Sequence, residues 1–295
     1  MKFSIVTPTF NSEKYIAETI ESVISQKGDF EIEYIVADGG SIDGTIYIIK
    51  EYERLIKDKS PLIKCNQVTF KWFSKNDRGM YEAINRGFEK ATGDIYAWIN
   101  SNDIYLPGAF EAVQKVFTRY AQVRWLKGIT SFINEDSTLV RAGRCYIYDR
   151  TWIQKGIYGR DTYFIEQDSV FWRSELWEAA GKIDPALKLA GDFYLWLRFA
   201  AITKMYTLRA YVSCFRIHEG QLSRGLGAYF KECDSFLSYE GLLRKWVRFY
   251  FMVQRLVPRL LRPVVYRLAF GRQDLNLIEL RGEDAVLSRK SYYCG

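Results

Sequence analysis

The stretch FSIVTPTFNSEKYIAETIESVI at residues 3–24 has the pattern of a strand followed by a helix. Residues 3–7 are a short apolar run that ends at Pro8, which is typical of a buried strand. Asn11 or Ser12 then stands where a helix cap is expected. The following apolar residues recur at helical spacing, at Ile16, Ile20, Val23 and Ile24. The chain is therefore predicted to open with a strand–helix unit.

The same order of strand and helix recurs along the first third of the chain. Further strands are predicted at residues 34–37, 68–73 and 95–99, and further helices at residues 44–55, 81–88 and 106–117. This alternation favours an α/β fold with a mostly parallel central sheet flanked by helices. Ligands of such sheets bind beyond the carboxyl ends of the strands, so we expect the loops after residues 7, 37, 73 and 99 to line one crevice.

The composition excludes several classes of protein. The chain has 295 residues, of which 48% are hydrophobic, so it can bury a sizeable core and is not a low-complexity chain. Its single histidine, His218, excludes a metal site built from two or three histidines. The five cysteines are scattered, as in a reduced cytosolic chain, and no signal peptide or membrane-spanning run is visible. We therefore expect a cytoplasmic protein.

The positive charge is confined to one segment. The chain carries a formal net charge of +7, and residues 241–273 contain eight basic and no acidic residues. The rest of the chain is close to neutral. A basic catalytic body that binds nucleic acid is therefore not indicated, and we expect no nucleic-acid partner.

Polar residues of a consistent type follow the four predicted strands. They read TPTFN at 7–11, DGGSIDG at 38–44, DRG at 77–79 and NSND at 100–103. A carboxylate at a strand end can accept hydrogen bonds from a ribose or a base, arginine beside a glycine turn suits a diphosphate, and Asp and Asn oxygens suit a hard divalent cation. Together they predict a site for a nucleoside diphosphate.

Each of these features also has an ordinary structural explanation. The Asp–Gly pairs are common turn residues, Asp103 could cap the helix that begins near Pro107, and Arg78 could be a solvated surface group. Neither G-x-G-x-x-G nor a phosphate-binding G-x-x-x-x-G-K-[ST] sequence follows the first strand, which weighs against dinucleotide oxidoreductases and P-loop proteins.

The ordered set of sequences resembles the inverting family 2 glycosyltransferases of the GT-A fold, particularly bacterial members that build surface polysaccharides. The matching stretches are SIVTPTFN (4–11), ADGGSIDGT (37–45), SKNDRGMYEAINRG (74–87), ATGDIYAWINSND (91–103), LAGDFYLWLRFA (189–200) and FRIHEGQLS (215–223). The resemblance spans residues 3–223. It implies a nucleoside-diphosphate-sugar donor, with UDP favoured, a divalent cation such as Mn²⁺ or Mg²⁺, and inversion at the anomeric carbon.

The resemblance also assigns roles to individual residues. The floor under the nucleotide would be Thr7, Pro8, Thr9 and Phe10. Asp38, with Gly39 beside it, would bind the base, Asp77 would help to hold the base, and Arg78 would approach the diphosphate. The family's acidic element falls on residues 100–103, which places Ser101 and Asn102 at the donor. The cation ligands would be Asn102, Asp103 and His218, although an amide at 102 replaces the usual Asp and should weaken cation binding.

Asp192 matches the catalytic base of the family. An acceptor hydroxyl must lose a proton as it attacks the anomeric carbon opposite the leaving diphosphate, and a carboxylate on the acceptor side can take that proton. The structural alternative is that Asp192 caps the helix predicted at residues 193–201.

We expect a glycosyltransferase domain at residues 1–225, with a nucleotide-binding half at 1–120 and an acceptor half at 121–225. Residues 226–295 are expected to form a helical, amphipathic and basic extension. On a helical wheel its arginines share one face, at Arg244, Arg248, Arg255, Arg259 and Arg262. Such a segment can lie on an anionic membrane surface at the inner face of the cell membrane, or pack on the catalytic body or on a second copy of the chain.

The sequence thus predicts transfer of a sugar to a hydroxyl of a glycan or of an acceptor carried on a polyprenyl diphosphate. Two alternatives stay open. One is a sugar nucleotidyltransferase, although the Gly-, Arg- and Lys-rich activation loop of that class is absent after the first strand. The other is a nucleotide-sugar-binding assembly protein in which the change at Asn102 has reduced activity.

Overall fold

The computed structural model describes residues 1–219, 221, 225–237, 276–282 and 284–288, and isolated short pieces between 245 and 265. Its first half contains β1 (Lys2–Thr9), α1 (Ile16–Ile24), β2 (Gly28–Asp38), α2 (Thr45–Lys57), β3 (Cys65–Ser74), α3 (Met80–Phe88), β4 (Ile95–Trp98), β5 (Ile104–Tyr105) and α4 (Ala109–Arg119). The strand–helix order predicted from the sequence is present, and the ends of the elements differ from the predicted ones by at most six residues, at the start of β2.

The second half of the chain adds shorter elements. They are β6 (Trp125–Ile133), β7 (Leu139–Arg141), α5 (Arg150–Gln154), the 3₁₀ turn η1 (Gln167–Ser169), β8 (Val170–Arg173), α6 (Ser174–Ala180), α7 (Gly191–Ile202), β9 (Tyr206–Arg216), α8 (Leu226–Asp234), β10 (Leu277–Arg281) and β11 (Asp284–Leu287). No helix in these described ranges is long and apolar enough to cross a bilayer.

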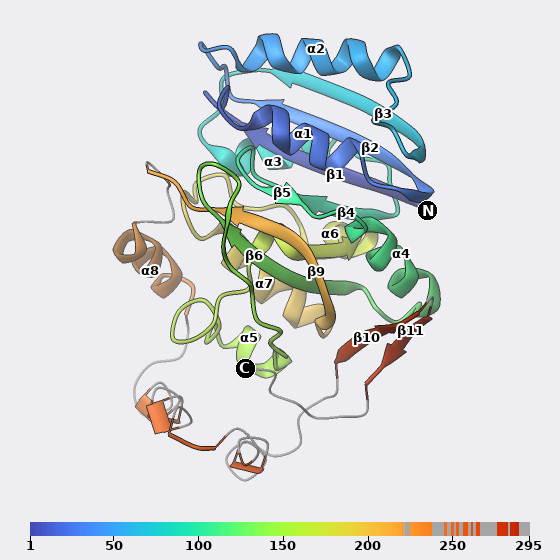
Figure 1. Ribbon diagram of the computed structural model, residues 1–295. Helices are drawn as coiled ribbons and strands as arrows, with labels where there is room; N and C mark the ends of the chain where they lie inside the picture. The colour runs from blue at the N-terminus through green and yellow to red at the C-terminus, as the bar shows by residue number, and fades with distance from the viewer. Residues whose placement is uncertain are drawn as a thin grey trace.

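One sheet runs through the molecule in the order β11-β10-β9-β6-β8-β4-β1-β2-β3 (Figure 1). The pairs β1–β2, β2–β3, β1–β4, β6–β9 and β9–β10 are parallel, and β8 is antiparallel to both of its neighbours. The carboxyl ends of β1, β2, β3, β4 and β9 therefore meet at one edge. The predicted α/β class with a mostly parallel sheet is confirmed.

Alternating side chains of the strands fill two cores. Ile5 of β1 packs in the first core, against α1, α2 and α4, and Val6 packs in the second, against α3, α5, α6 and α7. This alternation follows from the two-residue period of a strand. The second core is rich in tryptophan, with Trp98, Trp172 and Trp196 in mutual ring contact.

The C-terminal region differs from the helical extension expected over residues 226–295. Helix α8 is present, but residues 277–287 form β10 and β11, which add to the sheet beside β9. The expectation was wrong there because an unpaired edge of β9 offers backbone groups that an apolar segment such as LIEL can satisfy. The five arginines of the predicted basic face lie outside the described residues.

Candidate active site

Four loops lie at the carboxyl edge of the sheet, at residues 7–13, 38–45, 74–79 and 100–103, and we call them the carboxyl-end loops. Hydrogen bonds link the first of these loops to the second and to the fourth. Asn11 accepts a hydrogen bond from the Ile42 N–H at 2.9 Å, and its own N–H donates to Ser41 Oγ at 2.8 Å. Ser12 Oγ lies 2.7 Å from Ser101 Oγ. The prediction that Asn11 or Ser12 caps α1 is therefore wrong, because both side chains bond between loops instead.

The predicted nucleotide floor combines buried and exposed residues. Thr7 and Pro8 are buried at the end of β1, where Thr7 Oγ1 lies 2.9 Å from the Tyr34 hydroxyl. Thr9 is also buried, and its hydroxyl has no hydrogen-bond partner in the described part of the chain. The next residue, Phe10, leaves 61% of its surface exposed. The loop thus offers one exposed ring beside an unused hydroxyl.

Asp38 stabilises its own loop. Its carboxylate accepts hydrogen bonds from the N–H groups of Gly40 and Ser41 and from the hydroxyls of Ser41 and Ser74, at 2.5–3.0 Å. These four bonds occupy the usual capacity of a carboxylate. A base bound here would therefore have to share or replace one of these donors.

Gly39 and Asp77 lie side by side, as the sequence predicts for neighbouring strands. A Cβ on Gly39 would be 2.9 Å from Asp77 Oδ2, so a side chain at 39 would displace this carboxylate. Asp77 Oδ1 accepts the Gly79 N–H at 2.9 Å. Burial raises the pKa of Asp77, which the Gly79 N–H opposes. Arg78 does not join this pair, because its guanidinium bonds to Glu82 of α3 at 3.0 Å and is largely exposed.

Asn102 and His218 form a pair. Asn102 Nδ2 lies 2.8 Å from His218 Nε2, and His218 Nδ1 lies 2.7 Å from the Glu219 carbonyl. Because the amide nitrogen can only donate, His218 Nε2 accepts and Nδ1 carries the proton. The two residues meet because the carboxyl ends of β4 and β9 lie at the same edge of the sheet.

Asp103, predicted as a cation ligand, is fully buried instead. Its Oδ1 accepts the Arg216 N–H at 2.8 Å, and its Oδ2 accepts from Asn100 Nδ2 at 3.3 Å. Burial, with the charge of Asp168 added, raises the pKa of Asp103 well above its usual value. Asp103 therefore fastens the fourth loop to β9, and it is not the cap of α4.

The residues present do not fit a hard divalent cation. In the described residues, no group of three or more His, Cys, Asp or Glu side chains is placed to hold a metal ion. The groups near Asn102 are its own amide oxygen and the Nε2 atom of His218, which already accepts a hydrogen bond. Asp103 is fully buried and does not face them. Hard cations such as Mg²⁺ and Mn²⁺ prefer oxygen ligands, of which carboxylates are the usual protein source, over imidazole nitrogen. The predicted set of Asn102, Asp103 and His218 is thus not assembled as a cation site.

Arg216 is a site residue that the sequence reasoning missed. This guanidinium is fully buried and donates to the carbonyl of Asn102 at 2.8 Å, to Glu18 at 2.5 Å and to three groups of residues 134–137. It thereby holds the Asn102 loop against α1 and the β6–β7 turn. Two signals were available: Arg216 lies in the matched stretch at 215–223, and it stands two residues before the single histidine.

Asp192 is placed at the start of α7, four residues after Lys188, whose side chain contacts the third carboxyl-end loop. It is the second residue of the helix and is half-buried, and its Oδ1 accepts the adjacent Phe193 N–H at 2.7 Å. It does not occupy the cap position, which belongs to Ala190. Just before it, Lys188 Nζ donates to the Arg78 carbonyl at 2.5 Å, and the Tyr81 hydroxyl donates to the Leu189 carbonyl at 2.9 Å.

Burial raises the pKa of Asp192 to about 6; the Phe193 N–H opposes this effect and the charge of Glu232 adds to it. A carboxylate whose pKa is raised toward the working pH has a property that a general base needs.

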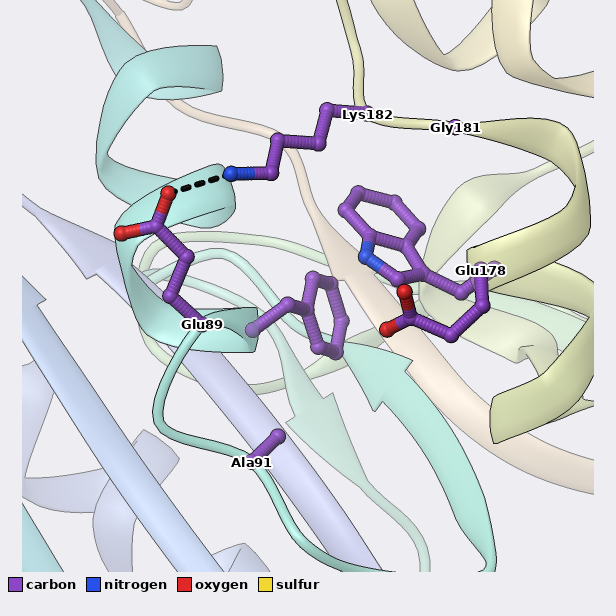
Figure 2. Close-up of a pocket in the computed structure, with 7 residues that line it drawn as sticks. Glu89, Ala91, Glu178, Gly181 and Lys182 are labelled. Carbon is purple, nitrogen blue, oxygen red and sulfur yellow. Dashed lines mark hydrogen bonds and ion pairs between the residues drawn. The ribbon is translucent and has the colours of Figure 1, made fainter.

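A separate cavity lies at the opposite edge of the sheet. It measures about 300 Å³ and is lined by residues of α3, α6 and the turns that follow them, with Lys182 paired to Glu89 at 2.5 Å (Figure 2). Ala91, in its lining, precedes β4, so this cavity lies at the amino end of that strand. It is therefore remote from the carboxyl-end loops.

Comparison with solved structures identifies the fold. The crystal structure of residues 1–349 of TarS from Staphylococcus aureus, in complex with UDP-GlcNAc, superposes with a TM-score of 0.57 at 16% sequence identity. The superposition covers 92% of this chain and 88% of that one. The GT-A fold expected from the sequence is confirmed.

Sequence comparison identifies the family. The model of glycosyl transferase family 2 matches residues 4–167, more than half of the chain. An uncharacterised glycosyltransferase of Nostoc sp. is 25% identical over 223 residues, and the match covers 74% of this chain but 65% of that protein. The poly(ribitol-phosphate) β-N-acetylglucosaminyltransferase TarS is 33% identical over 106 residues, which are 35% of this chain and 16% of TarS. The matched residues include all four carboxyl-end loops of the GT-A sheet. This chain therefore belongs to glycosyl transferase family 2.

Proposed function

We propose that this chain transfers a sugar, with inversion, from a nucleoside diphosphate to a hydroxyl of a glycan or lipid-linked acceptor in surface polysaccharide synthesis. The observation that carries the proposal is the half-buried Asp192, which follows a segment bonded to the Arg78 loop and has a pKa near 6. UDP is the favoured nucleotide, since the TarS structure holds UDP-GlcNAc. A lipid-linked acceptor is supported by a dolichyl-phosphate-sugar glycosyltransferase of Methanococcus voltae, 29% identical over 140 residues.

The chemistry is a single displacement. The acceptor oxygen forms a bond to the anomeric carbon while the bond from that carbon to the diphosphate breaks, and the hydroxyl proton passes to the Asp192 carboxylate. The nucleoside diphosphate leaves on the opposite face with the bonding electrons, so the configuration inverts. Phe10, Asp38, Gly39 and Asp77 would hold the nucleotide end of the donor. Because the residues around Asn102 do not fit a hard cation, no step is assigned to one.

Binding of the donor tests both the nucleotide and the cation parts of the proposal. UDP-GlcNAc at about 100 times its Kd is expected to stabilise the chain by about 2.7 kcal/mol, visible as a rise in Tm. We expect the gain to be nearly the same with Mn²⁺ as with EDTA. In an Asn102→Asp variant, which supplies a carboxylate, Mn²⁺ is expected to tighten donor binding about tenfold. A wild-type chain that binds UDP-GlcNAc only with Mn²⁺ would contradict the absence of a cation role.

Turnover separates the proposal from the alternative of a binding-only assembly protein. Release of UDP from UDP-GlcNAc, followed with and without a glycan acceptor, reports transfer or hydrolysis. Donor binding without any UDP release would favour the assembly protein.

We further propose that the C-terminal segment meets an anionic membrane. Its described pieces expose large apolar side chains, at Trp246, Phe249, Met252, Leu256, Leu261 and Val264. The same segment holds eight basic and no acidic residues between 241 and 273. Exposed apolar groups among basic residues favour contact with anionic lipid. Tyr250 is buried against Trp152, with ring centroids 6.0 Å apart, which ties the segment to the catalytic body.

Flotation with lipid vesicles tests this contact. The full chain is expected to float with vesicles that contain phosphatidylglycerol and much less with phosphatidylcholine alone, and salt should weaken the binding. A double variant, Trp246→Ser with Phe249→Ser, should reduce flotation several-fold, by about 1–2 kcal/mol of lost apolar insertion. Tyr47→Ser, at a still more exposed aromatic on α2, is the control. Equal flotation of the double variant and the control would argue against membrane contact.

A further inference from the structure

Helix α8 places a carboxylate on the segment that leads into Asp192. Glu232 Oε1 accepts the Lys188 N–H at 2.8 Å, and Oε2 accepts the N–H groups of Leu189 and Ala190 at 2.7 and 2.5 Å. These three consecutive N–H groups immediately precede α7, and the Ala190 N–H belongs to its cap residue. One side chain, from a helix more than forty residues further along the chain, therefore orders the entry to the base.

The opposite side of the same segment is held by α3. The Tyr81 hydroxyl donates to the Leu189 carbonyl, and a Cβ on Gly191 would lie 2.6 Å from the Tyr81 ring. Glycine at 191 thus permits the backbone to lie directly on the ring. The residues before Asp192 are thus held on one side by Tyr81 and on the other by Glu232. These contacts fix the backbone position from which the Asp192 side chain extends.

Glu232 also acts through its charge. The titratable groups that face Asp192 from the described elements packed around it are Tyr81 of α3 and Tyr229, Glu232 and Cys233 of α8. Of these four groups, Glu232 is the one whose charge raises the pKa of Asp192. Burial raises the pKa of both tyrosines and of Cys233. A negative charge near a second carboxylate favours the protonated form of the latter.

We propose that Glu232 is a positioning residue for the reaction: its carboxylate fixes the Lys188–Ala190 backbone, and with it the place of Asp192. The proposal rests on the proposed function, in which Asp192 is the base. It also makes α8 a working part of the active site, although α8 lies beyond the residues matched to the family.

The Glu232→Gln variant tests the proposal with two readouts. The amide keeps the size of the side chain but removes the charge and turns an N–H₂ group toward a backbone N–H. We expect kcat for UDP release from UDP-GlcNAc to fall about tenfold, with the donor KM within twofold of wild type. The pKa of Asp192, followed as its ¹³C carboxyl resonance and assigned from the Asp192→Asn spectrum, should fall by about half a pH unit.

Two further variants separate the possible failures. Glu232→Asp keeps the charge on a shorter side chain, so it should lose kcat but leave the pKa of Asp192 near that of wild type. Asp234→Asn removes the partner of Arg160 on the same helix and should move neither readout. An unchanged Asp192 resonance together with unchanged kcat in Glu232→Gln would overturn the positioning role. Full turnover in Asp192→Asn would instead contradict the proposed role of Asp192 as the base. That outcome is distinguishable from a failure of the positioning role of Glu232.

Discussion

The Asp192→Asn variant is expected to lose sugar transfer by a factor of about 10²–10⁴ while it binds UDP-GlcNAc as tightly as the wild-type chain. The amide oxygen can still accept the Phe193 N–H that now bonds to Oδ1 at 2.7 Å, so the start of α7 should keep its shape. What the amide cannot do is take a proton from the acceptor hydroxyl. UDP release under single-turnover conditions, beside a donor-binding curve, measures both quantities.

The pH dependence of the wild-type chain follows from the same group. Burial holds the pKa of Asp192 at about 6, so the carboxylate is protonated below that value and cannot act as a base. We expect the transfer rate to be nearly constant above pH 7 and to fall about tenfold per pH unit well below pH 6. The Asp192→Asn variant should show no such step in whatever activity remains.

Stability should change in the direction opposite to activity. The folded pKa of Asp192 is raised above its ordinary value, so the folded chain binds a proton more tightly than the unfolded chain between about pH 4 and 6, and stability is lost as the pH rises through this window. At pH 7 the ionised carboxylate costs up to about 3 kcal/mol. Asp192→Asn removes that cost and should therefore raise Tm.

A higher Tm with lost turnover would exclude misfolding as the cause of inactivity. Asp184→Asn, at an exposed loop carboxylate eight residues earlier, is the matched control and should leave both quantities unchanged. Turnover of Asp192→Asn within tenfold of wild type would show that another group takes the proton.

The sequence predicted the fold well because the fold depends on local periodicity. Side chains such as Ile5 and Val6 alternate between the two cores, and the helix on residues 16–24 presents its apolar face to the first core. The strands at 277–287 were missed because their pairing partner, β9, lies more than sixty residues away, and pairing at that distance leaves no local signal.

The candidate site was predicted less completely, since its side chains pair across loops. The pattern of residues and the family resemblance predicted Asp38, Gly39, Asp77 and Asp192 as site residues, but they could not show that Asp103 points into the sheet to meet the Arg216 N–H. Nor could it show that Asn102 faces His218, because that contact depends on the carboxyl ends of β4 and β9 lying together. The sequence shows which residue types stand near the strand ends, whereas the direction in which each side chain points depends on the tertiary structure.

Arg216 supplies the second large effect, on stability and on donor binding together. Its guanidinium has no exposed surface, and its five donor contacts reach the Asn102 carbonyl, the β6–β7 turn and Glu18 of α1. Lysine in its place keeps a charge but has no planar fork, so several buried carbonyl groups would lose their partner. Glu18 is partly exposed, which moderates the cost of the broken ion pair.

We expect Arg216→Lys to lower the free energy of unfolding by about 3 kcal/mol, which corresponds to a fall in Tm of roughly 5–10 °C. Because the Asn102 carbonyl loses its donor, UDP-GlcNAc should bind at least about tenfold more weakly to the folded variant, measured well below its Tm. Glu18→Gln removes the same ion pair but leaves the bond to Asn102 intact. It should therefore lower Tm by less and leave donor affinity near that of wild type. Equal losses of donor affinity in the two variants would mean that Arg216 acts through α1 and not through the Asn102 loop.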